Sequence, residues 1–225
     1  VRMIDEKGEI VPPGAFIPAA ERYNLMAGID RWVIREVFKL ISGNVKNDPL
    51  SRPNKVVSIN LSGDSLSDEG LYDYIVALRN EHGVSLNNIC FEITETVAIS
   101  NLVKATSLIN KLRQHGCLFS LDDFGSGLSS FGYLKNLPVD YLKIDGSFVR
   151  DMDTDDVNHA MVSAIQQLGS VIGIKTIAEF VENDIIIEML SQLGVDYAQG
   201  YAISMPQPLD DFDFSASRAA LNYSR

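Results

Sequence analysis

The sequence predicts an α/β fold built on a parallel sheet, and three observations support this prediction. Short runs rich in Val, Ile, Leu, Phe and Tyr alternate with longer segments of helical period from about residue 55 onward. Several of these runs are apolar almost throughout, as expected for parallel strands covered on both faces. A polar residue also interrupts each run near its carboxyl end, once per strand and helix.

Six strands are expected in this part of the chain, each bounded by turn residues or by a helical pattern. They are Lys55–Asn60, Asn88–Thr94, Cys117–Asp122, Asp140–Asp145, Lys175–Phe180 and Asp196–Ile203. Amphipathic helices are expected between them at Leu102–Leu112, Val157–Leu168 and Ile185–Leu193. Gly116 and Gly194 are expected to end the first and the last of these helices.

The segment before residue 55 is expected to be largely helical. Pro12-Pro13-Gly14 indicates a turn, and Ala15–Leu40 carries helical material, with Pro18 near a helix start and a break around Asn24–Gly28. Val1-Arg2-Met3 resembles the end of a strand, so the chain is expected to be a fragment that lacks its first strand or holds only part of it.

The polar residues at the strand ends favour a barrel over an open, doubly wound sheet. In a barrel they would all converge on one mouth, whereas an open sheet brings together only those at its switch point. Their even distribution therefore predicts a (β/α)8-type barrel. These residues are Asn60, Glu92, Asp122, Asp123, Lys143, Asp145, Glu179 and Gln199.

Composition narrows the function classes. The 225 residues include 19 Lys and Arg against 30 Asp and Glu, a net charge of −11 that argues against binding of nucleic-acid polymers. Cys90 and Cys117 stand in apolar runs, which excludes a disulfide framework and indicates a reducing compartment. No apolar stretch approaches the roughly 20 residues that cross a bilayer. A cytoplasmic location is expected, including the cytoplasmic part of a membrane-anchored protein, and residues 1–225 are expected to form one domain.

The strand-end carboxylates suit a pair of hard divalent cations, because Mg²⁺ and Mn²⁺ prefer oxygen ligands. Asp122-Asp123 can bridge such a pair, and Lys143 can hold an attacking water or a phosphoryl oxygen in two-metal hydrolysis of a phosphate ester. Simpler roles exist for single residues. Asp122-Asp123 could form a turn, Lys143 and Asp145 could form a salt bridge, and Glu95 could stabilise the first turn of a helix. The occurrence of all these acids at successive strand ends favours the metal site, since burying them without a cation is costly.

A set of motifs then follows in order along the chain. It comprises Phe16-Ile17-Pro18-Ala19-Ala20-Glu21, Asn60-Leu61-Ser62, Phe91-Glu92-Ile93-Thr94-Glu95-Thr96, Asp122-Asp123-Phe124-Gly125-Ser126-Gly127, Leu142-Lys143-Ile144-Asp145, Ala178-Glu179-Phe180-Val181-Glu182 and Gln199-Gly200-Tyr201. Together they closely resemble the EAL-domain family, bacterial phosphodiesterases that cut cyclic di-GMP to the linear dinucleotide pGpG. The resemblance implies a modified TIM barrel whose first strand runs antiparallel to the others.

The resemblance also implies roles for individual residues. Asn60, Glu92 and Asp122 would bind one Mg²⁺ or Mn²⁺, and Asp122, Asp123 and Glu179 would bind the second. Glu179, Lys143 and Gln199 would form the catalytic group around the nucleophilic water, with Glu179 as a possible general base. Glu95 would anchor the loop after Asp123, which couples metal binding to the dimer interface. Substrate contacts or support of the site would come from Arg2, Asp145 and Glu182.

Two departures from the family pattern stand out. The signature Glu-Ala-Leu is absent because Val1 falls just after it, so one metal ligand of the family is missing from this sequence. Phe180 stands where the family usually has Gly, and it could crowd the mouth beside Glu179.

Three functional hypotheses follow from the resemblance and the acids. The first is a metal-dependent cyclic di-GMP phosphodiesterase, a homodimer and the C-terminal module of a longer signalling protein with upstream GGDEF or sensory domains. Its dimer surfaces would include the loop after Asp145 and the helix Val157–Leu168. The second is a receptor module that binds cyclic di-GMP without cleaving it. The third, an unrelated metal-dependent barrel hydrolase, requires the motif match to be accidental.

Overall fold

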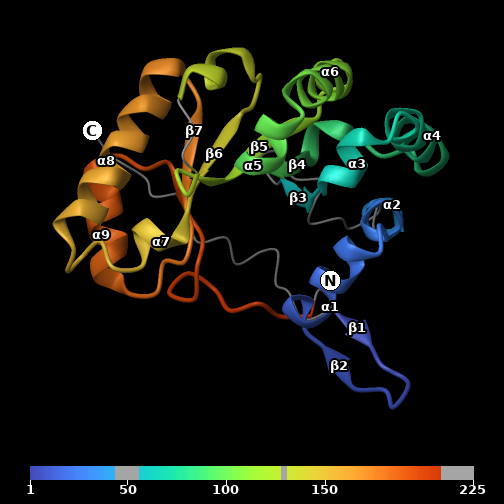
Figure 1. The fold of residues 1–225 in the computed structure, drawn as a ribbon, viewed down its shortest axis with the longest axis horizontal. Helices are drawn as coiled ribbons and strands as arrows, with labels where there is room; N and C mark the ends of the chain where they lie inside the picture. Colours follow the sequence, from blue (N-terminus) through green and yellow to red (C-terminus); the bar gives the residue numbers. More distant parts are fainter. Residues whose placement is uncertain (44–55, 128–130, 209–225) are drawn as a thin grey trace. The chain divides into compact units, whose positions relative to one another are not determined.

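The computed structural model describes residues 1–43, 56–127 and 131–208, which form two compact units (Figure 1). The first unit comprises Val1–Phe91 and Val103–Cys117, and the second comprises Glu92–Leu102 and the chain from Leu118 onward. The second carries most of the residues to which the sequence assigned chemistry.

Six strands are hydrogen-bonded in chain order. They are β3 (Val57–Asn60), β4 (Ile89–Thr94), β5 (Leu118–Phe124), β6 (Tyr141–Ile144), β7 (Lys175–Ala178) and β8 (Tyr197–Ala198). The pairs β5–β6, β6–β7 and β7–β8 are parallel. A doubly wound sheet reverses its strand order at a switch point, and this sheet does not, so the predicted barrel class is confirmed.

Four of the six expected strands match closely, and two are shorter than predicted. β7 ends at Ala178 rather than at Phe180, because Phe180 has φ +52° and cannot continue an extended strand. β8 covers only Tyr197–Ala198, since the chain then turns and the amides of Ile203 and Ser204 donate to the Gly200 carbonyl. Lys55, the predicted start of the first strand, lies outside the described residues.

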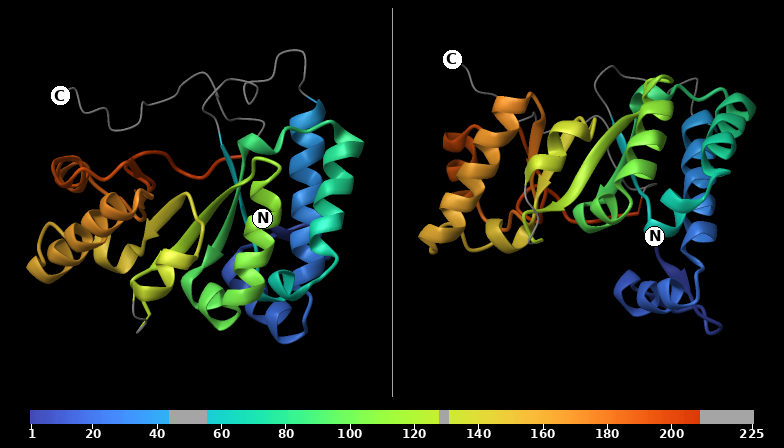
Figure 2. Two further views of the ribbon diagram at one scale, coloured as in Figure 1. Left: turned by 90° about the horizontal axis from the view of Figure 1, so that it is seen from above. Right: turned by 45° about the horizontal axis from the view of Figure 1, so that its top comes forward.

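The first unit begins with an antiparallel hairpin of β1 (Met3–Ile4) and β2 (Ile10–Val11). The Asp5 carboxylate accepts hydrogen bonds from the amides of Lys7 and Glu9 and so closes this hairpin. Helices α1 (Pro13–Arg22), α2 (Met26–Gly43), α3 (Gly63–Ser67) and α4 (Leu71–His82), with most of α6 (Leu102–Arg113), complete the unit. Helices α2 and α4 lie side by side in both views of Figure 2 and bury Ile34, Phe38, Leu71 and Ile75.

Two expectations about the proline-rich start were wrong. Pro12-Pro13-Gly14 is not an isolated turn, because α1 begins at Pro13, where the missing proline N–H needs no intrahelical partner. Pro18 lies inside α1 rather than near its start. The helix break is confirmed but narrower than expected. It is centred on Asn24, which has φ +54°, and Gly28 already lies within α2.

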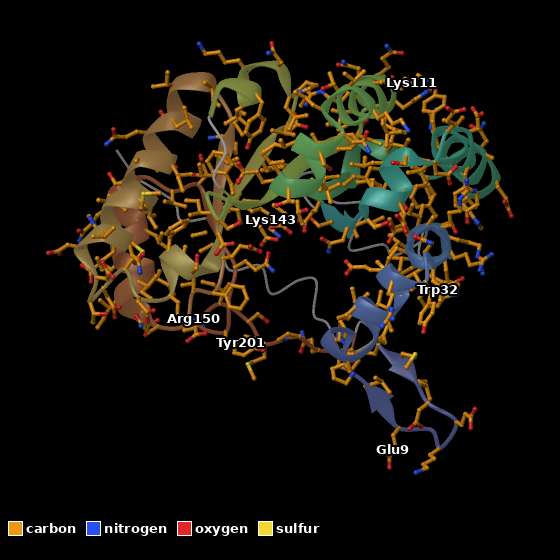
Figure 3. All side chains as sticks on the ribbon, in the orientation of Figure 1. Glu9, Trp32, Lys111, Lys143, Arg150 and Tyr201 are labelled. Atoms are coloured by element: carbon orange, nitrogen blue, oxygen red, sulfur yellow. The ribbon has the colours of Figure 1, made fainter. Side chains whose placement is uncertain are left out.

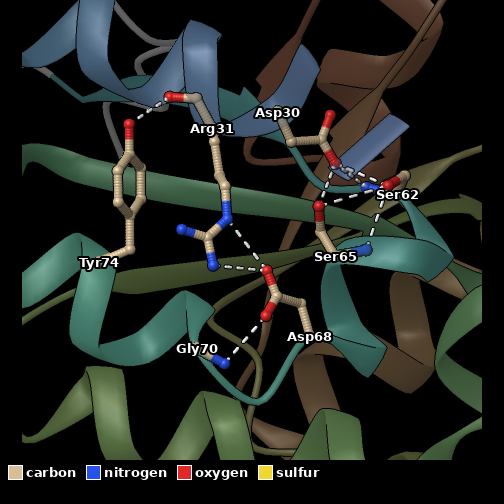
Figure 4. Close-up of polar contacts among 7 residues, drawn as sticks. All are labelled: Asp30, Arg31, Ser62, Ser65, Asp68, Gly70 and Tyr74. Carbon is tan, nitrogen blue, oxygen red and sulfur yellow. Dashed lines mark hydrogen bonds and ion pairs between the residues drawn. The ribbon is translucent and has the colours of Figure 1, made fainter. Parts of the chain in front are cut away.

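One polar network joins α2 to β3, α3 and α4 within the first unit (Figure 4). The buried Asp30 carboxylate accepts hydrogen bonds from the Ser62 amide, the Ser62 hydroxyl and the Ser65 hydroxyl at 2.8, 2.7 and 2.6 Å. The neighbouring Arg31 pairs with Asp68 at 2.6 Å and accepts the Tyr74 hydroxyl on its carbonyl. This network fixes the turn that directly follows Asn60.

The second unit places helices on its parallel strands. It contains α5 (Glu95–Ser100), α7 (Gly146–Val149), α8 (Asp156–Ile172) and α9 (Asp184–Leu193), and α8 packs on β6 and β7. Asp155 caps the start of α8, and Asn183 caps the start of α9. Gly194 ends α9 with φ +84°, as predicted. Among the residues that the structure describes, no helix combines the length and the apolar character needed to span a membrane.

Candidate metal centre and active site

Lys143 occupies the centre of an acidic cluster in the second unit (Figure 3). Its ammonium nitrogen lies 3.0 Å from Glu92 Oε2, 2.9 Å from Asp122 Oδ1 and 2.8 Å from Glu179 Oε1. Lys143, Glu92 and Glu179 are each less than a tenth exposed, at 3%, 7% and 8%. These side chains come from the carboxyl ends of β4, β5 and β6 and from the residue after β7, as the sequence predicted.

The electrostatics of this cluster follow from its burial. Burial alone would lower the pKa of Lys143, but the carboxylates of Glu92, Asp122 and Glu179 outweigh it and raise that pKa. Burial raises the pKa of Glu179 to about 7, against the opposing effect of Lys143. Burial also raises the pKa of Asp123, with help from the nearby charges of Asp122 and Asp145. The cluster therefore holds more negative charge than its one ammonium neutralises.

A local irregularity in β5 aims the two adjacent aspartates. The pairing of β5 with β6 shifts its register between Leu121 and Phe124, and bulges of this kind redirect side chains. Asp123 has φ +54°, and its amide donates to Asp122 Oδ1 at 3.0 Å. In a regular strand adjacent side chains point to opposite faces, whereas here both carboxylates reach the same cluster.

Three of these acids form a group that could hold a metal ion. One carboxylate oxygen from each of Asp122, Asp123 and Glu179 lies within 4.8 Å of the other two. An all-oxygen donor set of this charge fits Mg²⁺ or Mn²⁺ rather than a softer metal. The donor chemistry is therefore compatible with the predicted cofactor.

Glu95 contacts the segment after Asp123, the segment that the family resemblance assigned it to anchor. It begins α5 and is buried, with Oε2 accepting the Gly125 amide at 3.0 Å and Oε1 accepting the Tyr133 hydroxyl at 2.6 Å. Burial, followed by this contact with Glu95, raises the pKa of Tyr133, so the hydroxyl stays protonated as a donor. Stabilising a helix turn is thus not the whole role of Glu95. Leu128-Ser129-Ser130, the end of the predicted coupling loop, lies outside the described residues.

A cavity of about 410 Å³ borders the acidic cluster beside Glu179. Its lining residues are Glu179, Phe180, Glu182, Gln199, Gly200 and Tyr201. The Gln199 amide donates to the Ala178 carbonyl at 2.8 Å, and its carbonyl accepts the Val181 amide at 3.1 Å. A Cβ at Gly200 would overlap the backbone of Val181, so only glycine lets these two segments approach so closely. Gln199 and Glu179 thus line the same cavity, and the predicted role of Gln199 in orienting the water stays a prediction.

The remaining predicted residues lie in simpler surroundings. Asp145 caps α7, accepting the Ser147 amide at 2.7 Å, and the alternative of a salt bridge with Lys143 is not found because Lys143 binds three other carboxylates. Glu182 is exposed and pairs with Arg150 at 3.5 Å. Asn60 ends β3 and Arg2 precedes β1, both in the first unit and both exposed, and their proposed roles stay predictions.

Sequence reasoning missed the surroundings of Phe180. Its left-handed backbone was not anticipated, although the departure from Gly at this position was the available signal. Arg150, which places its guanidinium carbon 4.9 Å from the centre of the Phe180 ring, carries no motif and could not have been found from the sequence.

Comparisons with known proteins agree on one family. A sequence model of the EAL domain matches residues 1–206. A relative named cyclic di-GMP phosphodiesterase PdeB, from Shewanella oneidensis, is 46% identical over 212 residues, which are 94% of this chain and 24% of that protein. Cyclic di-GMP phosphodiesterase PdeF from Escherichia coli is 35% identical, over 94% of this chain and 28% of its own length. The chain thus spans about a quarter of the length of these relatives.

Two solved structures are also similar to this chain. A structure described as the PaMucR phosphodiesterase in complex with c-di-GMP superposes with a TM-score of 0.86 at 31% identity, covering 93% of this chain and 83% of that one. The FimX EAL domain from Pseudomonas aeruginosa bound to c-di-GMP gives a TM-score of 0.85 at 31% identity, covering 95% and 84%.

Proposed function

Because the chain belongs to the EAL-domain family, we propose that it hydrolyses cyclic di-GMP to linear pGpG with the help of two divalent cations, Mg²⁺ or Mn²⁺. The observation that carries the proposal is the buried cluster in which Glu92, Asp122 and Glu179 surround Lys143. Its relatives named as cyclic di-GMP phosphodiesterases support the choice of substrate.

The proposed metal ligands divide into two sets that share Asp122. Asp122, Asp123 and Glu179 form one set, supported by the 4.8 Å spacing of their oxygens. Glu92 and Asp122, with Asn60 as a predicted further ligand, form the other. Bound divalent ions would supply Lewis acidity and lower the pKa of a water nucleophile.

The residues of the chain supply positioning and proton transfer for this reaction. A water attacks phosphorus, the bond from phosphorus to the 3′ oxygen breaks, and the ring opens to a 5′-phosphorylated dinucleotide. Glu179 accepts the proton of the water, and the 3′ oxygen takes a proton from solvent. Lys143 donates to the water or to a phosphoryl oxygen, and Gln199 orients the water.

Further residues of the chain are assigned supporting roles. We assign Arg2, Asp145 and Glu182 to substrate contact or support, and Glu95 to the coupling of the loop after Asp123 with a dimer interface. We also propose that the protein is a homodimer, that GGDEF or sensory domains lie upstream of this module, and that it is located in the cytoplasm. Residues 1–225 would then be one EAL module of a longer protein.

The direct test is an assay of cyclic di-GMP cleavage in Mn²⁺ and in Mg²⁺, with pGpG measured by chromatography. Glu92→Gln and Asp122→Asn are expected to lower kcat by at least about a hundredfold, since each removes a charged ligand. Glu188→Gln, on the exposed face of α9, is the matched control and should keep full activity. A folded protein that forms no pGpG at any metal concentration would refute the proposed hydrolysis.

The competing function is a receptor that binds cyclic di-GMP without cleaving it. The acidic cluster favours the enzyme, because its carboxylate oxygens can hold a metal ion and a receptor that does not cleave its ligand needs no such group. Equilibrium binding separates the two, since a receptor would bind cyclic di-GMP and release no pGpG.

A further inference from the structure

Ser120 is a buried polar residue that the proposed hydrolysis does not use. It lies within β5, and its side chain is completely buried. Among the residues that the structure describes, none forms a hydrogen bond with its hydroxyl oxygen. Buried hydroxyls in folded proteins are nearly always bonded to protein groups or to ordered water, because burying one without a partner is costly. The Ser120 hydroxyl therefore requires a partner outside this set of residues.

The strand register places Ser120 on the same face of the sheet as the acidic cluster. Residues two positions apart in a strand point to the same face, so Ser120 shares the face of Asp122. On β6 the residue opposite Ser120 is Tyr141, two positions before Lys143. Lys143 binds Asp122 at 2.9 Å, so both strands lead to the same conclusion. The Ser120 hydroxyl lies one layer of side chains below the acidic cluster.

The spacing along β5 suits a bridging water better than a direct contact. Two residues of a strand span about 6.6 Å, twice the rise of about 3.3 Å. A water that bonds two oxygens at about 2.8 Å each joins atoms up to about 5.6 Å apart. Two side chains on one face that lean toward each other come within this reach. Such a water is as favourable in enthalpy as a direct hydrogen bond.

The Asp122 carboxylate can accept this further donor. Its Oδ1 accepts the Lys143 ammonium at 2.9 Å and the Asp123 amide at 3.0 Å, which uses both lone pairs of that oxygen. Its Oδ2 can accept a water on one lone pair and keep the other for a metal ion. Lys143 cannot serve Ser120 instead, because three carboxylates already take its three donors.

We propose that Ser120 is a positioning residue whose hydroxyl holds an internal water that donates to Asp122 Oδ2. The inference rests on the proposed function and adds a residue to its metal site. Lys143 and the Asp123 amide fix one oxygen of Asp122, and this water fixes the other. The carboxylate is then oriented before any ion arrives, so ion binding does not have to order it. Groups that orient a metal ligand in this way change metal affinity or activity about 10- to 100-fold.

Calorimetric titration of the whole chain with Mn²⁺ tests this role. Ser120→Ala removes only the hydroxyl oxygen and should weaken Mn²⁺ binding about tenfold. Ser58→Ala is the matched control. Ser58 also stands two residues before a predicted metal ligand, Asn60, but it is exposed on β3, so this variant should keep the affinity of the original protein.

The stability of the metal-free protein separates a bound water from an unpartnered hydroxyl. If the Ser120 hydroxyl had no partner, Ser120→Ala would remove the cost of a buried polar group and raise the urea midpoint in EDTA. If the hydroxyl binds the water, the substitution removes a hydrogen bond and the midpoint should not rise. A crystal structure of the metal-free protein should also show an ordered water within hydrogen-bond distance of Ser120 Oγ and Asp122 Oδ2.

The outcomes are distinct. Weaker Mn²⁺ binding in Ser120→Ala, without a rise in the urea midpoint, would support the positioning role. Unchanged Mn²⁺ affinity in this variant, or a crystal structure without the water, would overturn it, and the proposed function would stand if the unmodified protein cleaves cyclic di-GMP. An unmodified protein that neither binds Mn²⁺ nor forms pGpG would overturn both.

Discussion

At the scale of single residues, Lys143 acts as the internal counter-ion of the acidic cluster. Lys143→Met would leave three carboxylates buried without their shared ammonium, so we expect the metal-free protein to lose about 3–5 kcal/mol of stability. Mn²⁺ should recover part of this loss, because it restores positive charge at the same carboxylates. Urea denaturation in EDTA and in Mn²⁺ measures both effects.

Lys175 offers the matched control for that experiment. It also pairs with a carboxylate, that of Asp196 at 2.6 Å, but its side chain is 61% exposed. Lys175→Met should therefore lower the free energy of unfolding by less than about 1 kcal/mol, and Mn²⁺ should not change this loss. Equal losses in the two variants would contradict the role given to Lys143.

The titration of Glu179 predicts a pH dependence of the metal-free protein. Burial raises its pKa in the folded state to about 7, from an ordinary value of 4.5, so folding favours the protonated carboxyl. The stability that this group contributes is complete below pH 4.5 and is lost as the pH rises through 7. Denaturation in EDTA should show the free energy of unfolding decline by up to about 3 kcal/mol between pH 4.5 and pH 7. Glu179→Gln should abolish this part of the decline, and an unaltered pH profile in that variant would contradict the assignment.

At the scale of elements, the Asp30 network sets the turn between β3 and α3. Asp30→Ala would leave the Ser62 amide and two hydroxyls without their shared acceptor, at a cost of about 2–4 kcal/mol. Because Asn60 lies two residues before Ser62, the variant should also weaken Mn²⁺ binding if Asn60 is a ligand. Calorimetric titration with Mn²⁺ on the folded variant measures this second effect.

A neighbouring pair in the same network serves as the control. Asp68→Ala breaks the partly exposed ion pair with Arg31 and should cost only about 1 kcal/mol. It should leave Mn²⁺ affinity as it was, since Asp68 lies after α3 rather than next to Asn60. If both variants changed Mn²⁺ affinity equally, the effect would be a general loss of structure.

At the scale of the whole molecule, the sequence predicted the elements whose signals are local. The strands that carry Glu92, Asp122 and Lys143 follow from runs of apolar residues, and the end of α9 follows from Gly194. The errors arose where tertiary contacts decide the backbone. The chain leaves β8 early because Gly200 packs on the backbone of Val181. The left-handed backbone of Phe180 likewise depends on Gly146 and Arg150, which are distant in sequence.

From the net charge of −11 and the buried acids we expect the free energy of unfolding to rise when divalent ions are added. A ligand that binds only the folded state stabilises it by RT ln(1 + [L]/Kd), about 2.7 kcal/mol when its concentration is a hundred times Kd. The midpoint temperature of thermal unfolding should therefore rise when Mn²⁺ is added, and EDTA should reverse this rise. Asp122→Asn should remove most of the shift, because Asp122 is proposed to serve both ions. NaCl at matched ionic strength controls for screening of the net charge, and an equal shift in NaCl would show that screening, not site binding, stabilises the protein.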